Sequence, residues 1–316
     1  MIAYRDIVNF VRQFKWLRDF IWWARQSYYR VLRHIFIRKP IINGSHLIAE
    51  AIEDKKAFMA GKMGSVEAAA LHFHFKRLRK GKQALDYSNY AKHTLNVNAG
   101  VFPADSDTYD RFCQIYLSAV EKGDALVAWD VAGESEVFPK YCSDASLIEM
   151  RNLEPYFSDR PWSQAMAGKK ILVISPFAKT IESQYQKREE IWPDKNVLPH
   201  FDLLTIKAPL SAGLVTPKEK DWFESLENLK NQMDAYDYDV VLIGAGAFSL
   251  PLAAHAKANG KVGIHLGGAL QILFGVIGKR WREHPDFKTF ITDAWVAPSE
   301  EETPSDFKKI EGGCYW

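Results

Sequence analysis

Apolar runs alternate with helix-forming segments along most of the chain. Continuous apolar runs, which are typical of buried strands, occupy 57–64, 125–130, 169–175, 202–208, 238–246 and 261–268. Helix-forming composition or helical spacing fills 65–80, 217–236 and 248–260. Strands that alternate with helices predict an α/β fold with a mostly parallel sheet and helices on its faces.

This architecture indicates where functional side chains belong. In parallel α/β sheets, ligands bind at the carboxyl ends of the strands. We therefore expect the chemistry in the loops that follow residues 64, 130, 175, 244 and 266.

The first 40 residues carry a different pattern, an apolar stripe at helical spacing. The stripe comprises Ile7, Phe10, Val11, Phe14, Leu17, Ile21, Ala24, Tyr28, Val31 and Ile35. Nine Lys or Arg against two Asp give this segment a net charge of +7, and it is rich in aromatic residues. Such a basic amphipathic helix is typical of a segment in a membrane interface beside anionic headgroups. The alternative is a helical extension packed on the body or on a second subunit.

Turn-forming residues divide the chain. Pro40 and the Asn43-Gly44 pair end the basic segment, so we expect an N-terminal helical segment over 1–44 and an α/β domain over 45–316. A stretch that mixes prolines with aromatic residues at 151–164 predicts a connector between halves at about 45–150 and 165–298.

Composition excludes an intrinsically disordered chain, a collagen-like rod and a small disulfide-stapled protein. With 47% hydrophobic and 25% charged residues among 316, the chain has the composition of a globular protein. Three cysteines without a CxxC pair indicate a reducing compartment and no structural zinc. No apolar run is long enough to span a bilayer and no signal peptide is visible, so we expect a cytoplasmic protein whose residues 1–40 contact the inner face of the membrane. Phe10, Phe14 and Tyr28 lie on the apolar stripe, which disfavours a nucleic-acid arm.

The clearest local motif is a glycine turn after the strand at 238–246. Gly244 and Gly246 allow the backbone to approach an anion closely, and Ser249 replaces the third glycine of a GxGxxG fingerprint. After the next strand, His265 stands where a dinucleotide enzyme places an acidic residue, so we expect no NAD. The turn predicts phosphate or diphosphate binding. Many such turns merely join a strand to a helix.

Two further loops carry candidate phosphate ligands. Gly267 and Gly268 form a second glycine-containing turn after a strand, and a basic pair follows at 279–280. Ser175 and Lys179 follow another strand, and Arg188 lies further along. Basic side chains near a strand's carboxyl end suit phosphate oxygens, although a solvated helix face or a basic helix cap explains them equally well.

Carboxylates at two strand ends are the candidates for catalysis. Glu67 stands at the start of a helix, two residues past Ser65, where it can act as a general base, a metal ligand or simply a helix cap. Asp130 stands at the end of the strand at 125–130. Two carboxylates on neighbouring strands would together form a site.

Several short sequence segments resemble those of a known family. The strand, turn and helix of GKMGSVEA resemble the RFGDGE segment of bacterial GT-D glycosyltransferases, which act on nucleotide sugars. The strings NAGVFP, LEPYFSDRPWSQAMAGKKILVISPF, LIGAGAFSLPLAAHAK and IHLGGALQILFGVIGKRW look like proteins of capsule and O-antigen gene clusters. The resemblance covers roughly residues 45–285 and implies a Rossmann-like, GT-D-like fold.

The resemblance also implies roles for particular residues. Gly64 and Glu67 match the glycine and glutamate of the family's acidic DxE element, which is associated with a divalent metal and the sugar diphosphate. Ser65 stands in place of the aspartate, and the loss of one of two hard oxygen ligands weakens a Mg²⁺ or Mn²⁺ site. Gly244 and Gly246 match a turn that implies nucleotide contacts.

The expected function is therefore sugar transfer from a nucleotide-sugar donor to a lipid-linked or growing glycan in surface polysaccharide synthesis. One alternative is a nucleotide-sugar-modifying enzyme. The other is a non-catalytic polysaccharide-assembly protein that keeps the fold.

Overall fold

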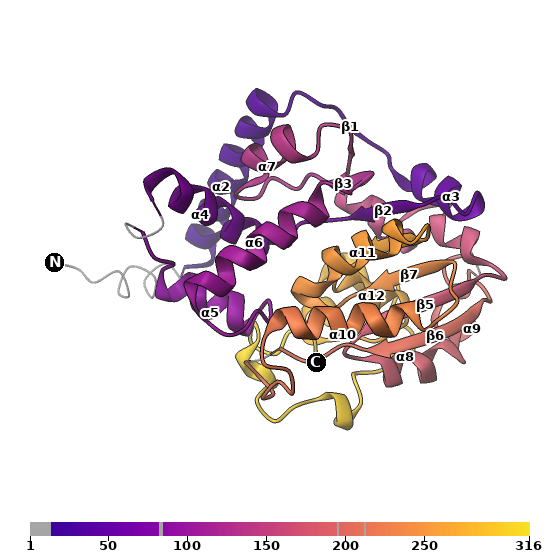
Figure 1. Ribbon diagram of the computed structural model, residues 1–316. Helices are drawn as coiled ribbons and strands as arrows, with labels where there is room; N and C mark the ends of the chain where they lie inside the picture. The colour runs from indigo at the N-terminus through magenta and orange to yellow at the C-terminus, as the bar shows by residue number, and fades with distance from the viewer. Residues whose placement is uncertain (1–13, 82–84, 195, 212) are drawn as a thin grey trace.

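The computed structural model describes residues 14–81, 85–194, 196–211 and 213–316. Its centre is an eight-stranded sheet in the order β1-β4-β3-β2-β8-β7-β5-β6, in which every pair of neighbouring strands is parallel (Figure 1). The strands are β1 (Ile41–Ile42), β2 (Phe58–Gly61), β3 (Ala125–Val127), β4 (Ser146–Ile148), β5 (Lys170–Ser175), β6 (Asp202–Lys207), β7 (Val240–Ile243) and β8 (Val262–His265). The predicted Rossmann-like, parallel α/β architecture is confirmed.

Helices cover both faces of this sheet. The α-helices are α2 (Lys15–Phe36), α3 (Ser45–Glu53), α4 (Ser65–Lys80), α5 (Asn89–Val97), α6 (Ser106–Val120), α7 (Glu134–Tyr141), α8 (Ala178–Tyr185), α9 (Arg188–Ile191), α10 (Trp222–Asp234), α11 (Ser249–Ala258), α12 (Ala269–Leu273), α13 (Lys279–Arg282) and α14 (Pro285–Lys288). The 3₁₀ turns are η1 (Met150–Leu153), η2 (Pro155–Phe157), η3 (Trp162–Met166), η4 (Gly246–Phe248), η5 (Glu300–Glu302) and η6 (Phe307–Lys309). In Figure 1, α6, α10 and α11 lie in front of the sheet.

Two hydrophobic cores lie on opposite faces of the sheet, because successive side chains of a strand point to opposite sides. In β5, Leu172 and Ile174 belong to the core beneath α6, α10 and α11. Their neighbours Ile171 and Val173 belong to the core beneath α3, α8 and α12. A strand buried on both faces reads as an uninterrupted apolar run, which is why β5 and β7 could be predicted from the sequence.

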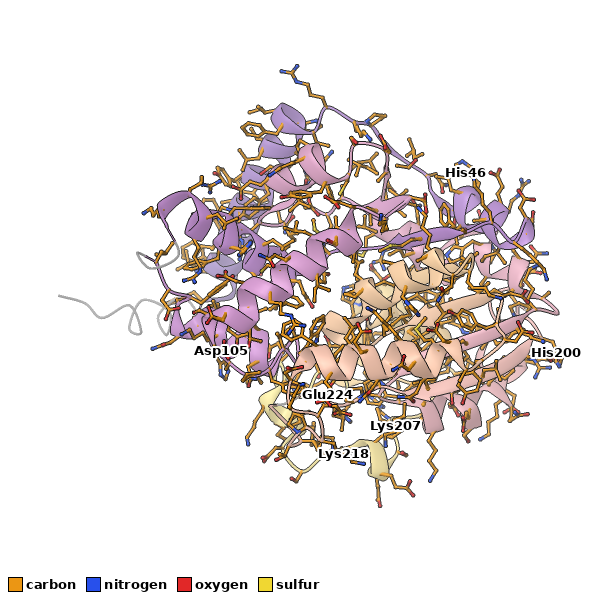
Figure 2. All side chains as sticks on the ribbon, in the orientation of Figure 1. His46, Asp105, His200, Lys207, Lys218 and Glu224 are labelled. Atoms are coloured by element: carbon orange, nitrogen blue, oxygen red, sulfur yellow. The ribbon has the colours of Figure 1, made fainter. Side chains whose placement is uncertain are left out.

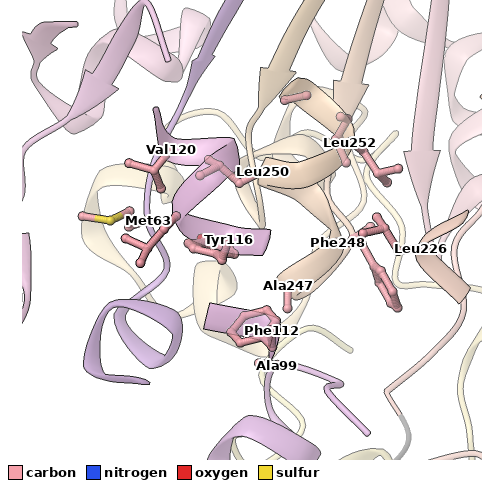
Figure 3. Close-up of a cluster of buried hydrophobic side chains, with 14 of the residues drawn as sticks. Met63, Ala99, Phe112, Tyr116, Val120, Leu226, Ala247, Phe248, Leu250 and Leu252 are labelled. Carbon is pink, nitrogen blue, oxygen red and sulfur yellow. The ribbon is translucent and has the colours of Figure 1, made fainter. Parts of the chain in front are cut away.

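The first of these cores supports the loops at the carboxyl edge of the sheet (Figure 3). The Phe112 ring of α6 meets Trp222 edge to face at 5.1 Å between centroids, and Trp222 stacks on Phe248 at 5.1 Å. Phe248 lies in the turn after β7, and Met63, in the turn after β2, belongs to the same core. The two turns are therefore fixed by packing that extends well beyond them.

Side-chain caps set where two of the long helices begin. Asp105, labelled in Figure 2, accepts the Thr108 N–H at 2.8 Å at the start of α6. Asp221 accepts the Glu224 N–H at 2.8 Å, so α10 begins at Trp222 and not at residue 217 as predicted. Each cap satisfies a backbone donor that the first helical turn leaves without an intrahelical partner.

The N-terminal segment and the two predicted halves share this sheet. Ile7, Phe10 and Val11 of the predicted stripe lie outside the described residues. Ile41 and Ile42, inside the predicted 1–44 segment, pair with β4 at one edge of the sheet. Strand β2 of the first half pairs with β8 of the second, so one sheet runs through both halves. The predicted connector at 151–164 folds into short 3₁₀ turns.

Among the described residues, none of the helices combines the length and the apolar character needed to cross a bilayer.

Candidate functional site

A cavity of about 800 Å³ opens at the carboxyl edge of the sheet. Its walls come from the loops after β2, β5, β7 and β8, from residues 98–100 and 209–211, and from the C-terminal segment. After β5 the chain crosses to β6 on one side, whereas β7 lies on the other side, so the crevice sits where the strand order reverses. Open parallel sheets bind their ligands at such a point.

The structure gathers most of the predicted site residues around this cavity. Those that line it are Gly64, Ser65, Glu67, Ser175, Gly244, Gly246, Gly267 and Gly268. Asp130, Lys179, Arg188 and Ser249 have other positions, described below. The loops selected from the sequence pattern are thus brought together, but not every side chain on them faces the same space.

Glu67 is a buried carboxylate in the first turn of α4. Its side chain folds back toward Gly64, and a Cβ atom at that position would collide with the carboxylate. Burial raises the pKa of Glu67, opposed by a hydrogen bond from its own backbone N–H; the negative charge of Glu311 raises it further, and the ammonium of Lys62 lowers it. Glu67 can therefore take up a proton at a higher pH than an exposed glutamate.

Lys62 supplies a mostly buried ammonium next to this carboxylate. Burial lowers its pKa; Glu154 raises that pKa, Arg280 lowers it, and Glu67 raises it. Its Nζ atom lies 3.5 Å from the Met150 sulfur and 5.7 Å from the centre of the Trp129 ring. These are weak partners for a cation, so the ammonium remains available to an anion in the cavity. Lys62 was not predicted from the sequence, although a lysine directly after a buried strand was visible there.

His265, at the end of β8, completes this group. Its Nδ1 atom is buried and has no hydrogen-bond partner among the described residues. Burial, together with the charge of Lys62, lowers the pKa of His265 to about 3, so the ring is neutral at physiological pH. From the sequence, His265 only disfavoured NAD and was not among the predicted site residues. The structure places an unpartnered ring nitrogen at the cavity wall.

The two glycine turns pack directly against one another. A Cβ atom on Gly244 would lie 2.7 Å from the Gly267 carbonyl oxygen. Gly246 has φ +54° and Gly267 has φ +60°, a backbone region that side chains with a Cβ atom rarely adopt. Glycine is therefore required at both turns for the backbones to meet at the cavity.

Two serines hold these loops. Ser249 is fully buried, and its Oγ accepts the Ala245 N–H at 2.9 Å, so it braces the glycine turn and does not line the cavity. Ser175 Oγ accepts the Phe177 N–H at 3.1 Å in the loop after β5. Ser249 therefore does not reach a phosphate in the cavity, which differs from its expected role, whereas Ser175 lines the cavity and its contact with a phosphate stays a prediction.

The N-terminus of α8 is already capped by a carboxylate from the far end of the chain. Glu302 is fully buried and accepts the backbone N–H groups of Lys179 at 2.8 Å and Thr180 at 3.2 Å. The exposed Lys179 ammonium lies 2.6 Å from Glu301, which raises the pKa of this lysine. Arg188 lies with its guanidinium 5.4 Å from the centre of the Tyr185 ring. Neither basic side chain faces the cavity, contrary to the sequence expectation.

Asp130 is bound to the N-terminal helix. Its carboxylate lies 2.7 Å from Arg33 Nε and 3.3 Å from Arg30 Nε. Its backbone has φ +60°, held by Glu134, which accepts the Asp130 N–H at 2.9 Å. Asp130 and Glu67 therefore do not form the predicted pair of carboxylates around one cavity, because Arg30 and Arg33 bind the Asp130 carboxylate. The preceding residue, Trp129, does line the cavity.

Helix α13 and the C-terminal segment form a basic and aromatic wall, of which the sequence analysis named only the basic pair at 279–280. The guanidinium of Arg280 lies 4.9 Å from the centre of the Tyr315 ring and pairs with Glu311. The backbone N–H of Lys279 donates to the carbonyl oxygen of Trp316 at 2.9 Å, which fixes the end of the chain against α13. Tyr315 and Trp316 both line the cavity, where their rings are suited to stack on a planar ligand.

The residues around Glu67 do not fit a divalent metal. Within the described ranges, no group of three or more His, Cys, Asp or Glu side chains is placed to hold a metal ion. The DxE element that GKMGSVEA resembles has an aspartate at the position of Ser65, and the charges that act on Glu67 are those of Glu311 and of the Lys62 ammonium. We therefore derive no step through a metal.

Compared with family models, with curated proteins and with solved structures, the chain gives no match.

Proposed function

We propose that the protein is a glycosyltransferase that moves a sugar from a nucleotide-sugar donor to a glycan or lipid-linked acceptor. The observation that carries this proposal is that a buried carboxylate, Glu67, and a mostly buried ammonium, Lys62, line the same cavity. That cavity lies at the reversal of strand order and is of a size typical of small-molecule sites, which span about 300–1,000 Å³.

The basic and glycine-rich side of the cavity suits the donor diphosphate. Lys62 and Arg280 supply positive charge, and charge-assisted contacts to phosphate oxygens are among the strongest hydrogen bonds in proteins. The absence of side chains at Gly246 and Gly267 lets the backbone approach the phosphates. Tyr315 and Trp316 provide rings against which a nucleotide base can stack.

The carboxylate suits the acceptor side of the reaction. In the transfer step, an acceptor hydroxyl oxygen forms a bond to the anomeric carbon, the bond from that carbon to the diphosphate oxygen breaks, and Glu67 takes the hydroxyl proton. A general base works best when its pKa lies near the working pH, and burial moves the pKa of Glu67 in that direction. Lys62 and Arg280 would stabilise the charge that develops on the departing diphosphate.

The resemblance of GKMGSVEA to the GT-D segment supports the choice of reaction. Glu67 matches the acidic residue that remains of the DxE element in GKMGSVEA, and it lines the cavity together with Glu311.

A ligand screen followed by a turnover assay tests the proposal. We expect one class of UDP-, GDP-, CMP- or dTDP-sugar to raise the melting temperature, without a requirement for Mn²⁺, because bound ligand stabilises the folded state. Turnover of that donor should require a glycan acceptor. Donor conversion without an acceptor would identify a nucleotide-sugar-modifying enzyme. Donor binding without any turnover would favour a non-catalytic assembly protein, and the absence of any donor binding would overturn the proposal.

A further inference from the structure

The N-terminal helix α2 presents its apolar side chains to solvent. The exposed members are Trp16, Phe20, Ile21, Trp23, Tyr28, Val31, Ile35 and Phe36. At 100° per residue, all of them except Phe36 in the last turn fall within one half of the helix circumference, so they form one continuous outward stripe. Trp16 is 68% exposed and Trp23 is 60% exposed, whereas large apolar side chains of a globular protein are usually buried.

Polar contacts hold the opposite side of α2 to the body. Arg33, which points away from the stripe, pairs with the buried Asp130 at 2.7 Å. Beyond the helix, Lys39 Nζ donates to the Ala145 carbonyl oxygen at 3.0 Å, and β1 joins the sheet. Ile37 is buried on this side. The helix is therefore attached through ion pairs and its last turn, with its apolar stripe facing away from the molecule.

An apolar stripe of this size on a surface marks an interaction site. Its composition of Trp, Tyr and Phe beside basic residues matches helices that lie in the headgroup region of a bilayer. Residues 1–40 carry a net charge of +7, while the remainder of the chain sums to −5. Attraction to an anionic surface is thus concentrated in the segment of residues 1–40 that contains this helix. Pairing two copies stripe to stripe would instead bring two strongly basic segments together, which disfavours a second copy as the occupant.

We propose that α2 docks the protein on an anionic lipid bilayer, with the outward stripe immersed in the interface and its basic residues beside lipid phosphates. Asp130, which holds the helix, directly follows Trp129, which lines the cavity. The docked helix therefore lies at the same edge of the sheet as the cavity. A lipid-linked acceptor would then reach the cavity from the bilayer, a consequence that rests on the proposed glycosyltransferase function.

Vesicle sedimentation of the full chain tests the docking independently of any catalysis. We expect the protein to sediment with phosphatidylcholine vesicles that contain about 30 mol % phosphatidylglycerol, and far less with phosphatidylcholine alone. Raising the salt from about 0.1 M to about 1 M should weaken binding, because the Debye length shortens from about 10 Å to about 3 Å.

Substitutions on the stripe locate the contact. Trp23→Glu and Phe20→Glu should each weaken vesicle binding at least about tenfold, because they place a charge among the immersed apolar groups. Tyr236→Glu, at an exposed aromatic residue just after α10, is the matched control and should bind as the parent does. All three variants should keep a melting temperature close to the parent's, because the replaced side chains lie at the surface and not in either core.

Two results would overturn the docking proposal. One is equal sedimentation of the parent with neutral and anionic vesicles, or with neither. The other is a parent that is dimeric by light scattering, ignores vesicles, and becomes monomeric on Trp23→Glu, which would assign the stripe to a second copy. Neither result bears on donor binding, so a failure here is distinguishable from a failure of the proposed transferase activity.

Discussion

Replacing Glu67 by glutamine tests whether this residue is a base or only part of a helix start. The substitution keeps the size of the side chain and one acceptor oxygen, but it removes the ability to take up a proton. General-base catalysis typically contributes about 10²–10⁴-fold to rate, or about 2.7–5.4 kcal/mol of transition-state stabilisation. Losing a helix cap costs only about 0.5–2 kcal/mol of folding stability. The two roles therefore predict opposite patterns.

In the catalytic interpretation, turnover of the bound donor falls at least about a hundredfold, while donor affinity stays close to the parent value. The melting temperature should shift by no more than about 4 °C. The pH profile gives a further sign. Because burial raises the pKa of Glu67, the parent rate should rise with pH along a limb centred above the ordinary glutamate value of about 4.3. The glutamine variant should lack that limb.

Glu134→Gln is the matched control, since Glu134 is also buried with a raised pKa, at about 7, caused mainly by burial. Its oxygens accept the N–H groups of Trp129 at 3.1 Å and Asp130 at 2.9 Å, and its side chain does not line the cavity. We expect this variant to lose about 1–3 kcal/mol of stability, because the new amide faces backbone donors, and to lose far less turnover than Glu67→Gln. A Glu67→Gln enzyme with parental turnover would refute the assignment of Glu67 as the base.

Three further substitutions have distinct expected results. Gly246→Val should abolish donor-induced thermal stabilisation, because a φ of +54° and the Ala99 oxygen, 3.2 Å from where a Cβ atom would lie, exclude a branched side chain. The control is Gly260→Val, with φ +76° and open space around it. Both variants should lose about 1–3 kcal/mol of stability, but Gly260→Val should keep donor binding. Glu302→Ala should lower stability by about 1–3 kcal/mol in a denaturant titration by leaving the α8 donors unpaired, whereas Glu301→Ala, at an exposed ion pair, should leave it nearly unchanged. Lys62→Met should weaken donor binding about 10–100-fold by calorimetry without lowering the melting temperature, because it removes a charged contact and also a buried charge; unchanged donor affinity would remove Lys62 from the site.

Much of the fold could be predicted because long buried strands and their helices have local patterns. The strands near the middle of the sheet, such as β5 and β7, are apolar on both faces and stand out in the sequence. Strands β1 and β4, with two and three residues, are too short to show any period. Helix α6 was not predicted, although Asp105 at its cap and apolar residues at helical spacing from Tyr109 onward were visible in the sequence.

The candidate site was predictable where its geometry is local. A glycine turn after a strand is visible in a short string, and so is Glu67 at a helix start. The positions of the Asp130 and Lys179 side chains depend on partners 97 and 122 residues away, namely Arg33 and Glu301. No local pattern reports such a partner. The GT-D resemblance, and the activity that it implies, stay predictions.

The positive charge in the cavity bears on the difference between this chain and the GT-D segment that GKMGSVEA resembles. A sugar diphosphate needs positive charge to leave, and the DxE element of the family is associated with a divalent metal. Here one of its two acidic positions carries Ser65, and the ammonium of Lys62 lies close enough to influence the pKa of Glu67. A lysine ammonium that loses water contacts on burial is stabilised when an anion binds beside it. Lys62, whose charged form is disfavoured by burial, is therefore the residue best placed to bind the diphosphate. For this reason, donor affinity should depend on Lys62 and not on added Mn²⁺.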